Sequence, residues 1–286
     1  MAQSPKIVKA RFSEGVAWLT GGGNLLARGG GALVRIALFL VVISLLQAVP
    51  VVGLALVALI TPLVTAGLLN VFRTVEQGGT PGPAHFLAGF TDPAARTGLL
   101  MLGVFFVAGL LAAIAALLAW LAPQMDLQAA GQVLSDPNVV NESPERVLAL
   151  FEGVNLFGGF ALAALIFAIV LAAVYFAVPL VFFWRWPVFA ALLWSVRATL
   201  VNWLAFLGFG LVVFGLLFAV GLVFGLFSGI FSLALGGAGM LVVQLVSIIL
   251  SLFVQLLLAA AQWRAFVQVF PADSDDPSGP KDAVAL

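Results

Sequence analysis

Residues 203–261 read WLAFLGFGLVVFGLLFAVGLVFGLFSGIFSLALGGAGMLVVQLVSIILSLFVQLLLAAA, a run that contains no Asp, Glu, Lys, Arg or His. A helix crosses the apolar core of a bilayer, about 30 Å thick, with about 20 apolar residues. The run is therefore long enough for two crossings. We predict them near 203–227 and 239–262, with the turn at Gly229 and the glycine-rich stretch 236–239.

The composition of the whole chain supports a membrane protein. Hydrophobic residues make up 63% of the sequence and charged residues 8%, whereas soluble domains carry about 25% charged residues. The formal net charge is zero, so we expect no field that attracts nucleic acid and no nucleic-acid partner. The chain has no cysteine and one histidine, His85, which excludes disulfides, thiolate chemistry and any site that needs two imidazoles.

Hydropathy predicts an all-α, polytopic transmembrane helix bundle of about six spans plus short interfacial helices. Residues 1–31 form a cytoplasmic or interfacial segment, residues 32–270 a membrane domain, and residues 271–286 a disordered cytoplasmic tail. The remaining spans lie near 32–48, 51–72, 98–122 and 155–183. A short helix is expected over 188–202, with Ser195, Thr199 and Asn202 on one side.

The distribution of basic residues predicts the orientation of these spans. With the N-terminus inside, six spans place eleven of the twelve Lys and Arg residues on the cytoplasmic side, and only Arg146 outside. This is the positive-inside pattern. The eleven are Lys6, Lys9, Arg11, Arg28, Arg35, Arg73, Arg96, Arg185, Arg197, Arg264 and Lys281. We therefore predict that both termini are cytoplasmic.

Aromatic residues mark the predicted span ends, as expected for side chains at a membrane interface. The expected anchors are Trp120, Trp184, Arg185, Trp186, Trp203 and Trp263. Arg185, between two tryptophans, is an interfacial anchor or, alternatively, a ligand of a lipid phosphate. Trp18 lies in the N-terminal segment, which we expect to lie along the membrane surface.

Several loose motifs resemble those of a known family. In order they are NLLAR at 24–28, Pro50, ITPLVTAGL at 61–69, His85-Phe86 with Ala88-Gly89-Phe90, SVRATLVNWLAFL at 195–207 and AAAQWRAFVQVF at 259–270. The chain resembles the YciC-like group of bacterial six-helix inner-membrane proteins. The resemblance covers most of residues 12–271. It implies a location in the bacterial inner membrane and supplies no catalytic residue.

A polar seam on the sixth predicted span is the best candidate for a binding site. Gln244, Ser247, Ser251, Gln255 and Gln262 fall on one face of a helix. Such a seam either lines a path for a neutral polar solute or forms hydrogen bonds between helices, and polar residues in bundles mostly do the latter.

Small residues in the fifth span predict close helix packing. Gly221, Gly225 and Gly229 recur at every fourth position, a spacing that lets helix backbones approach each other. We expect them to pack within the chain, with contact between two copies as the alternative.

The sequence offers little for catalysis. Glu76, His85 and Asp92 share the first cytoplasmic loop and are the only candidates for a metal site or for lipid chemistry at the interface. No predicted span contains Asp or Glu, which disfavours a proton or sodium relay, and no phosphate-binding loop occurs.

These observations leave three hypotheses. The first is a non-enzymatic accessory, scaffold or assembly component that acts with an unidentified membrane protein. The second is a permease or channel for a small neutral or lipid-like molecule, which would use the seam. The third is a membrane enzyme at the cytoplasmic interface. We predict no enzyme activity, no cofactor and no metal, and a lipid bilayer as the surroundings.

Overall fold

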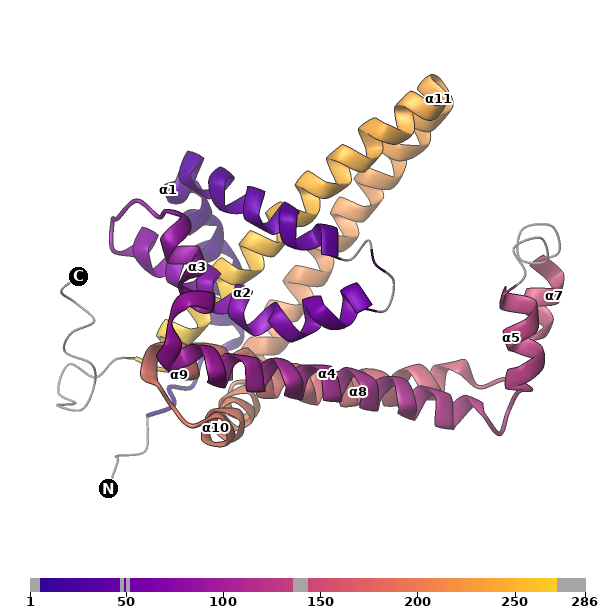
Figure 1. The fold of residues 1–286 in the computed structure, drawn as a ribbon, viewed down its shortest axis with the longest axis horizontal. Helices are drawn as coiled ribbons and strands as arrows, with labels where there is room; N and C mark the ends of the chain where they lie inside the picture. Colours follow the sequence, from indigo (N-terminus) through magenta and orange to yellow (C-terminus); the bar gives the residue numbers. More distant parts are fainter. Residues whose placement is uncertain (1–5, 47–48, 50–51, 136–143, 272–286) are drawn as a thin grey trace. The chain divides into compact units, whose positions relative to one another are not determined.

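The fold is known from a computed structural model that describes residues 6–46, 49, 52–135 and 144–271 (Figure 1). Over these ranges the chain is helical and has no strand, which confirms the predicted all-α membrane bundle. The predicted tail, except Pro271, lies outside the described residues.

The described helices, in chain order, are α1 Phe12–Leu45, α2 Val52–Glu76, α3 Pro83–Thr91, α4 Pro93–Leu121, α5 Leu127–Ser135, α7 Pro144–Ala149, α8 Leu156–Tyr175, α9 Ala177–Trp184, α10 Val188–Val201 and α11 Trp203–Val269. Five stretches are long and apolar enough to cross a membrane, namely α1, α2, α4, α8 with α9, and α11. The chain separates into two compact units: residues 1–103 with 173–286, and residues 104–172.

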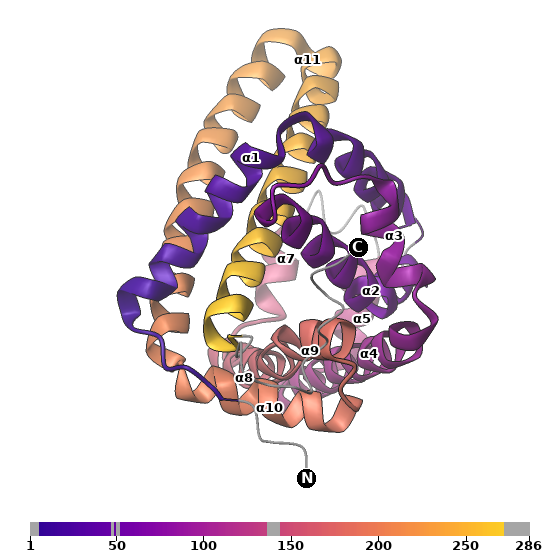
Figure 2. The ribbon, with the colours of Figure 1, turned by 90° about the vertical axis from the view of Figure 1, so that its left-hand side faces the viewer.

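The longest helix, α11, is a hairpin. Gly236 has φ 54° and ψ −128° inside it, a backbone conformation that residues other than glycine rarely adopt. The chain reverses there, and the two arms run back side by side (Figures 1 and 2). The turn lies within the predicted glycine stretch 236–239, whereas Gly229 belongs to the first arm. Because of this turn, α11 supplies both of the crossings predicted from residues 203–261.

Helix α1 also breaks at a glycine. Gly30 has φ 47° and ψ −135°, so residues 12–29 and 31–45 are separate helical parts. The first part packs on α11, where a Cβ added to Gly15 would lie 1.8 Å from the carbonyl oxygen of Ala205. Trp18 is 1% exposed. The N-terminal segment therefore packs part of its apolar face on α11, where a close-packed glycine contact is available, and its expected position along the membrane surface stays a prediction.

Polar side chains join the helices of the first unit. The backbone N–H of Ala10 donates to Oδ1 of Asn202 at 2.6 Å, and the backbone N–H of Phe176 donates to Oγ of Ser195 at 2.9 Å. Ser195 and Asn202 are both fully buried. The polar side predicted for the helix over 188–202 therefore faces the protein interior and satisfies backbone groups.

The second unit contains the distal part of α4, α5, α7 and most of α8. Phe106 contacts Phe167, with ring centroids 6.1 Å apart. Near the far end of this helix pair, the indole of Trp120 donates to the carbonyl oxygen of Asn155 at 2.9 Å, and Oε1 of Gln124 accepts the backbone N–H of Asn155. This contact fixes the end of α4 to the start of α8.

Candidate functional site

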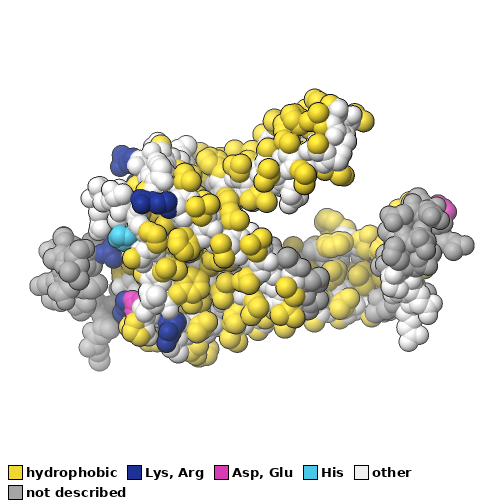
Figure 3. Space-filling view, turned by 45° about the horizontal axis from the view of Figure 1, so that its top comes forward, with side chains coloured by type: hydrophobic (Ala, Val, Ile, Leu, Met, Phe, Trp, Pro, Cys, Tyr) yellow, Lys and Arg dark blue, Asp and Glu magenta, His cyan; other side chains and the backbone are white. Residues whose placement is uncertain are grey.

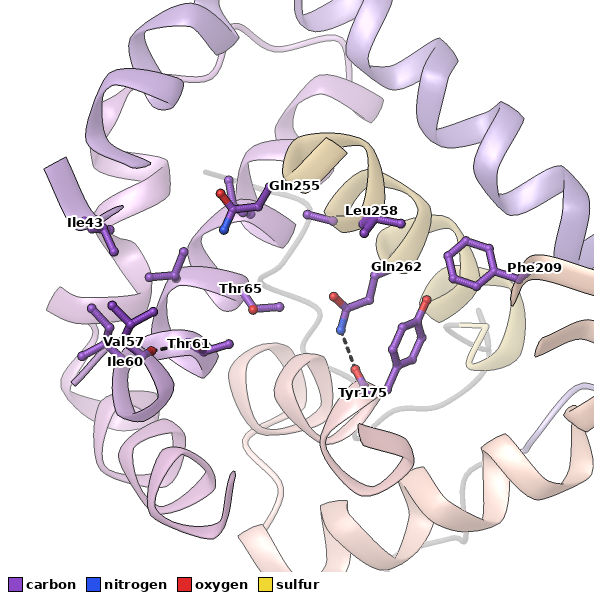
Figure 4. A pocket seen from close by; sticks show the side chains of 13 residues that line it. Ile43, Val57, Ile60, Thr61, Thr65, Tyr175, Phe209, Gln255, Leu258 and Gln262 are labelled. Atoms are coloured by element: carbon purple, nitrogen blue, oxygen red, sulfur yellow. Dashed lines mark hydrogen bonds between the residues drawn. The ribbon is translucent and has the colours of Figure 1, made fainter. Parts of the chain in front are cut away.

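The first unit contains a cavity of about 280 Å³ between α2 and α11 (Figure 4). Its lining residues come from α1, α2, the end of α8 and both arms of α11. They are Ile43, Val57, Ile60, Thr61, Val64, Thr65, Leu68, Tyr175, Phe209, Gln255, Leu258, Ala259 and Gln262. None of them carries a charge, so the cavity is an apolar chamber with a few hydroxyl and amide groups.

Gln262 donates a hydrogen bond that a proline on another helix cannot provide. A helical carbonyl accepts from the backbone N–H four residues later, but four residues after Tyr175 stands Pro179, which has no N–H. Nε2 of Gln262 donates to the carbonyl oxygen of Tyr175 at 2.6 Å instead (Figure 4). Because a carbonyl can only accept, this bond fixes the amide orientation and leaves Oε1 of Gln262 as an acceptor.

Three other polar groups of the cavity have no hydrogen-bond partner among the described residues. They are the hydroxyl of Thr65 on α2, the amide of Gln255 on α11 and the phenol hydroxyl of Tyr175. The hydroxyl of Thr61 donates to the carbonyl oxygen of Val57 within its own helix. Thr65 is half buried, Gln255 is exposed and the Tyr175 hydroxyl is buried. In hydrocarbon an unpaired polar group is costly, so these groups favour a polar ligand at this place.

The phenol of Tyr175 forms part of the wall beside Gln262 (Figure 4). Its ring makes edge contacts with Phe176 and Phe206, with centroids 4.9 and 5.2 Å apart. The hydroxyl is buried and has no partner in the described part of the chain. Aromatic packing therefore holds this ring firmly in place next to the amide of Gln262.

A hydrogen bond and an ion pair connect the end of α2 to α11. Glu76 accepts from the indole of Trp263 at 2.7 Å and forms an ion pair with Arg264. Arg185 and Asp92 form a second ion pair, between the end of α9 and the start of α4. In the space-filling view, basic side chains and the histidine lie near one another on one side of the first unit (Figure 3).

The structure divides the seam predicted on the sixth span. Gln255 and Gln262 line the cavity, and Gln244 does not. The hydroxyls of Ser247 and Ser251 donate to carbonyl oxygens of their own helix, those of Gln244 and Ile248. Of the predicted seam, only Gln255 and Gln262, which lie nearest to the charged groups, therefore line the cavity.

The glycine run of the fifth span faces open space in the structure. A Cβ added to Gly221, Gly225 or Gly229 would meet no atom within 4 Å. Close packing is seen at other glycines, for example where a Cβ on Gly208 would lie 2.5 Å from the carbonyl oxygen of Phe12. A packing role for the run in the fifth span therefore stays a prediction.

The three candidates for metal binding are not brought together. Glu76 and Asp92 are engaged by Arg264 and Arg185, and Nδ1 of His85 accepts the backbone N–H of Gly82 at 3.0 Å. No group of three or more His, Asp or Glu side chains that could hold a metal occurs in the part of the chain that the structure describes. The described fold therefore does not bring Glu76, His85 and Asp92 together into one site.

The predicted aromatic anchors occupy different environments. Trp120 and Trp203 are 37% and 58% exposed, whereas Trp263 is buried. Trp184 and Trp186 contact each other across the turn at Arg185, whose φ is 57°. The interfacial role of these residues stays a prediction.

Sequence reasoning missed Thr61, Thr65 and Tyr175. The two threonines lie four residues apart on α2, a spacing that places both on one face, and that spacing was the available signal. Tyr175 carries no such signal, since only the fold brings it to the cavity. No family model, no curated protein and no solved structure matches this chain.

Proposed function

We propose that this membrane protein is a non-enzymatic permease for a small neutral or lipid-like molecule, which it binds in the cavity between α2 and α11. The observation that carries the proposal is the convergence of Thr65, Gln255 and Gln262 on a cavity lined by no charged residue. Amide and hydroxyl groups recognise an uncharged polar ligand by hydrogen bonds, while an ion would enter without a counter-charge.

Flux into vesicles tests this proposal, with glycerol as the neutral probe. The full chain, reconstituted in phosphatidylcholine vesicles, should accelerate glycerol entry measured by light scattering. Gln255→Leu should lower the rate to that of empty vesicles, because it removes a free amide from the cavity wall. Gln244→Leu is the matched control on the same arm and should behave as the wild type. A wild-type rate equal to that of empty vesicles would discard the proposal.

A role as an accessory or assembly component is the second candidate. It is supported by the exposed hairpin of α11, where Leu222, Leu226 and Leu233 are 55%, 69% and 91% exposed beside the open glycine run. Crosslinking in native membranes should then capture one defined membrane protein. If the wild type and a Gly225→Leu variant give the same products, the hairpin is not the contact.

We also propose a location in the bacterial inner membrane with both termini in the cytoplasm. Eleven basic residues on one predicted side support this orientation. The resemblance to the YciC-like group supports the bacterial membrane. The ion pairs of Glu76 with Arg264 and of Asp92 with Arg185 would then lie at the cytoplasmic face, where charged groups remain hydrated.

A further inference from the structure

We infer that the ligand of the cavity is an uncharged lipid with a hydroxyl-bearing head, of the class of the monoacylglycerols, which enters from the bilayer. This inference rests on the proposed function and names its substrate class. It follows from four features of the cavity: its aliphatic side, its polar groups that have no hydrogen-bond partner among the described residues, the absence of charged residues from its lining, and its volume.

One side of the cavity carries three aliphatic side chains. Ile43, Val57 and Ile60 line one side of it and are half buried, and Gln255 is the exposed residue of the lining, whereas Leu68 and Ala259 are buried. In Figure 4 the first three gather on one side, opposite Gln262 and Tyr175. An acyl chain therefore has an apolar entrance from the surrounding lipid.

The surface beside this entrance is apolar as well. Leu45 at the end of α1 is 64% exposed, and Val52 and Leu56 at the start of α2 are 58% and 44% exposed. In a membrane such side chains contact acyl chains of the bilayer. A lipid tail could thus remain in the bilayer while its head enters the cavity.

The hydrogen-bonding groups require a ligand that both donates and accepts. Oε1 of Gln262 can only accept, because Nε2 is engaged by the carbonyl oxygen of Tyr175. The Gln255 amide and the Thr65 hydroxyl each offer a donor and an acceptor. A quinone or a simple ester, which has only acceptors, would leave Oε1 unpaired. A hydroxyl satisfies both kinds of group.

The absence of charge from the lining excludes ionised heads. A carboxylate or a phosphate would lose its hydration in the cavity and gain no cation, which is strongly unfavourable. At about 30 Å³ for each water-sized group, a cavity of about 280 Å³ accepts a glycerol head and several methylene groups. The rest of the chain must lie in the open entrance.

Photolabelling tests the inference. The full chain in phosphatidylcholine nanodiscs is irradiated with a monoacylglycerol that carries a diazirine in its acyl chain, and the adducts are mapped by mass spectrometry. We expect saturable adducts on residues 57–65 and 255–262. Unlabelled monoacylglycerol should compete, and a fatty acid of the same length should not.

Variants make the labelling decisive. Gln255→Leu should weaken labelling about tenfold, as expected for the loss of one hydrogen bond, while Gln244→Leu should label as the wild type. Adducts spread over the exposed hairpin, or equal labelling of Gln255→Leu, would overturn the inference. If glycerol flux occurs without such adducts, the lipid class is wrong and the proposed permease stands. If neither occurs, both are wrong.

Discussion

Gln262 on α11 supplies the hydrogen-bond donor that Pro179 cannot provide to the carbonyl oxygen of Tyr175, over a distance of 2.6 Å. Gln262 thus stabilises the break between α8 and α9, although it lies 87 residues after Tyr175 in the sequence. On the next residue, the backbone N–H of Phe176 finds its acceptor in Ser195 of α10. One contact therefore joins the helix break to the wall of the cavity.

The first prediction concerns this contact. Gln262→Leu should lower the free energy of unfolding by about 0.6–2 kcal/mol, because the carbonyl of Tyr175 loses its donor. Gln255→Leu should leave stability unchanged, since Gln255 has no partner among the described residues. Unfolding in mixed micelles, followed by circular dichroism, measures both. Equal destabilisation by the two variants would contradict the assignment.

The second prediction concerns Glu76, which binds both Trp263 and Arg264. Glu76→Leu should destabilise the protein more than Arg264→Met. The ion pair is partly exposed and contributes about 0.2–1 kcal/mol, whereas the buried indole N–H of Trp263 would lose its acceptor, at about 1–3 kcal/mol. Thermal unfolding of the two variants in one detergent compares them. A larger effect of Arg264→Met would show that the indole bond contributes little.

The third prediction tests the packing of α1 on α11. Gly15→Ala places a methyl group where the carbonyl oxygen of Ala205 is only 1.8 Å away, so the helices must separate at a cost of about 1–3 kcal/mol. Gly23 lies on the same part of α1 and has nothing within 4 Å of an added Cβ. Gly23→Ala should be neutral or stabilising by up to about 1 kcal/mol. Melting temperatures that fall equally would exclude this packing.

Hydropathy and glycine placement predicted the helical architecture well. The turn of α11 falls at Gly236, inside the predicted stretch 236–239, and the break of α1 at Gly30 lies next to the predicted boundary between residues 31 and 32. Such features are local, because residues other than glycine rarely adopt the combination of positive φ and ψ near −130° seen at Gly30 and Gly236.

The packing of the N-terminal segment and most of the cavity could not be predicted in the same way. The sequence does not indicate that Trp18 is buried in the protein, where its ring contacts Phe206 and Phe209 of α11. Gln255 was predicted as a site residue, while its neighbours Thr65 and Tyr175 come from other helices. Side chains from separate helices meet only through tertiary packing, and the hydrophobic periodicity of the sequence does not predict that packing.

The fourth prediction concerns orientation. The chain has no cysteine, so the reagent can label only the single cysteine that is introduced. Gly131→Cys in α5 should react with a membrane-impermeant maleimide in intact bacterial spheroplasts, because the proposed topology places the segment between the predicted spans 98–122 and 155–183 outside. Gln77→Cys, at the end of α2, should react only after permeabilisation. The opposite pattern of labelling would reverse the proposed topology.

The most direct test of the account is the mass spectrum of small molecules that co-purify with the full chain in mild detergent. The cavity predicts an uncharged molecule that is retained by the wild type and by Gln244→Leu and is depleted in Gln255→Leu. An anionic lipid as the specifically retained species, or identical spectra for the wild type and Gln255→Leu, would contradict a charge-free binding site between α2 and α11.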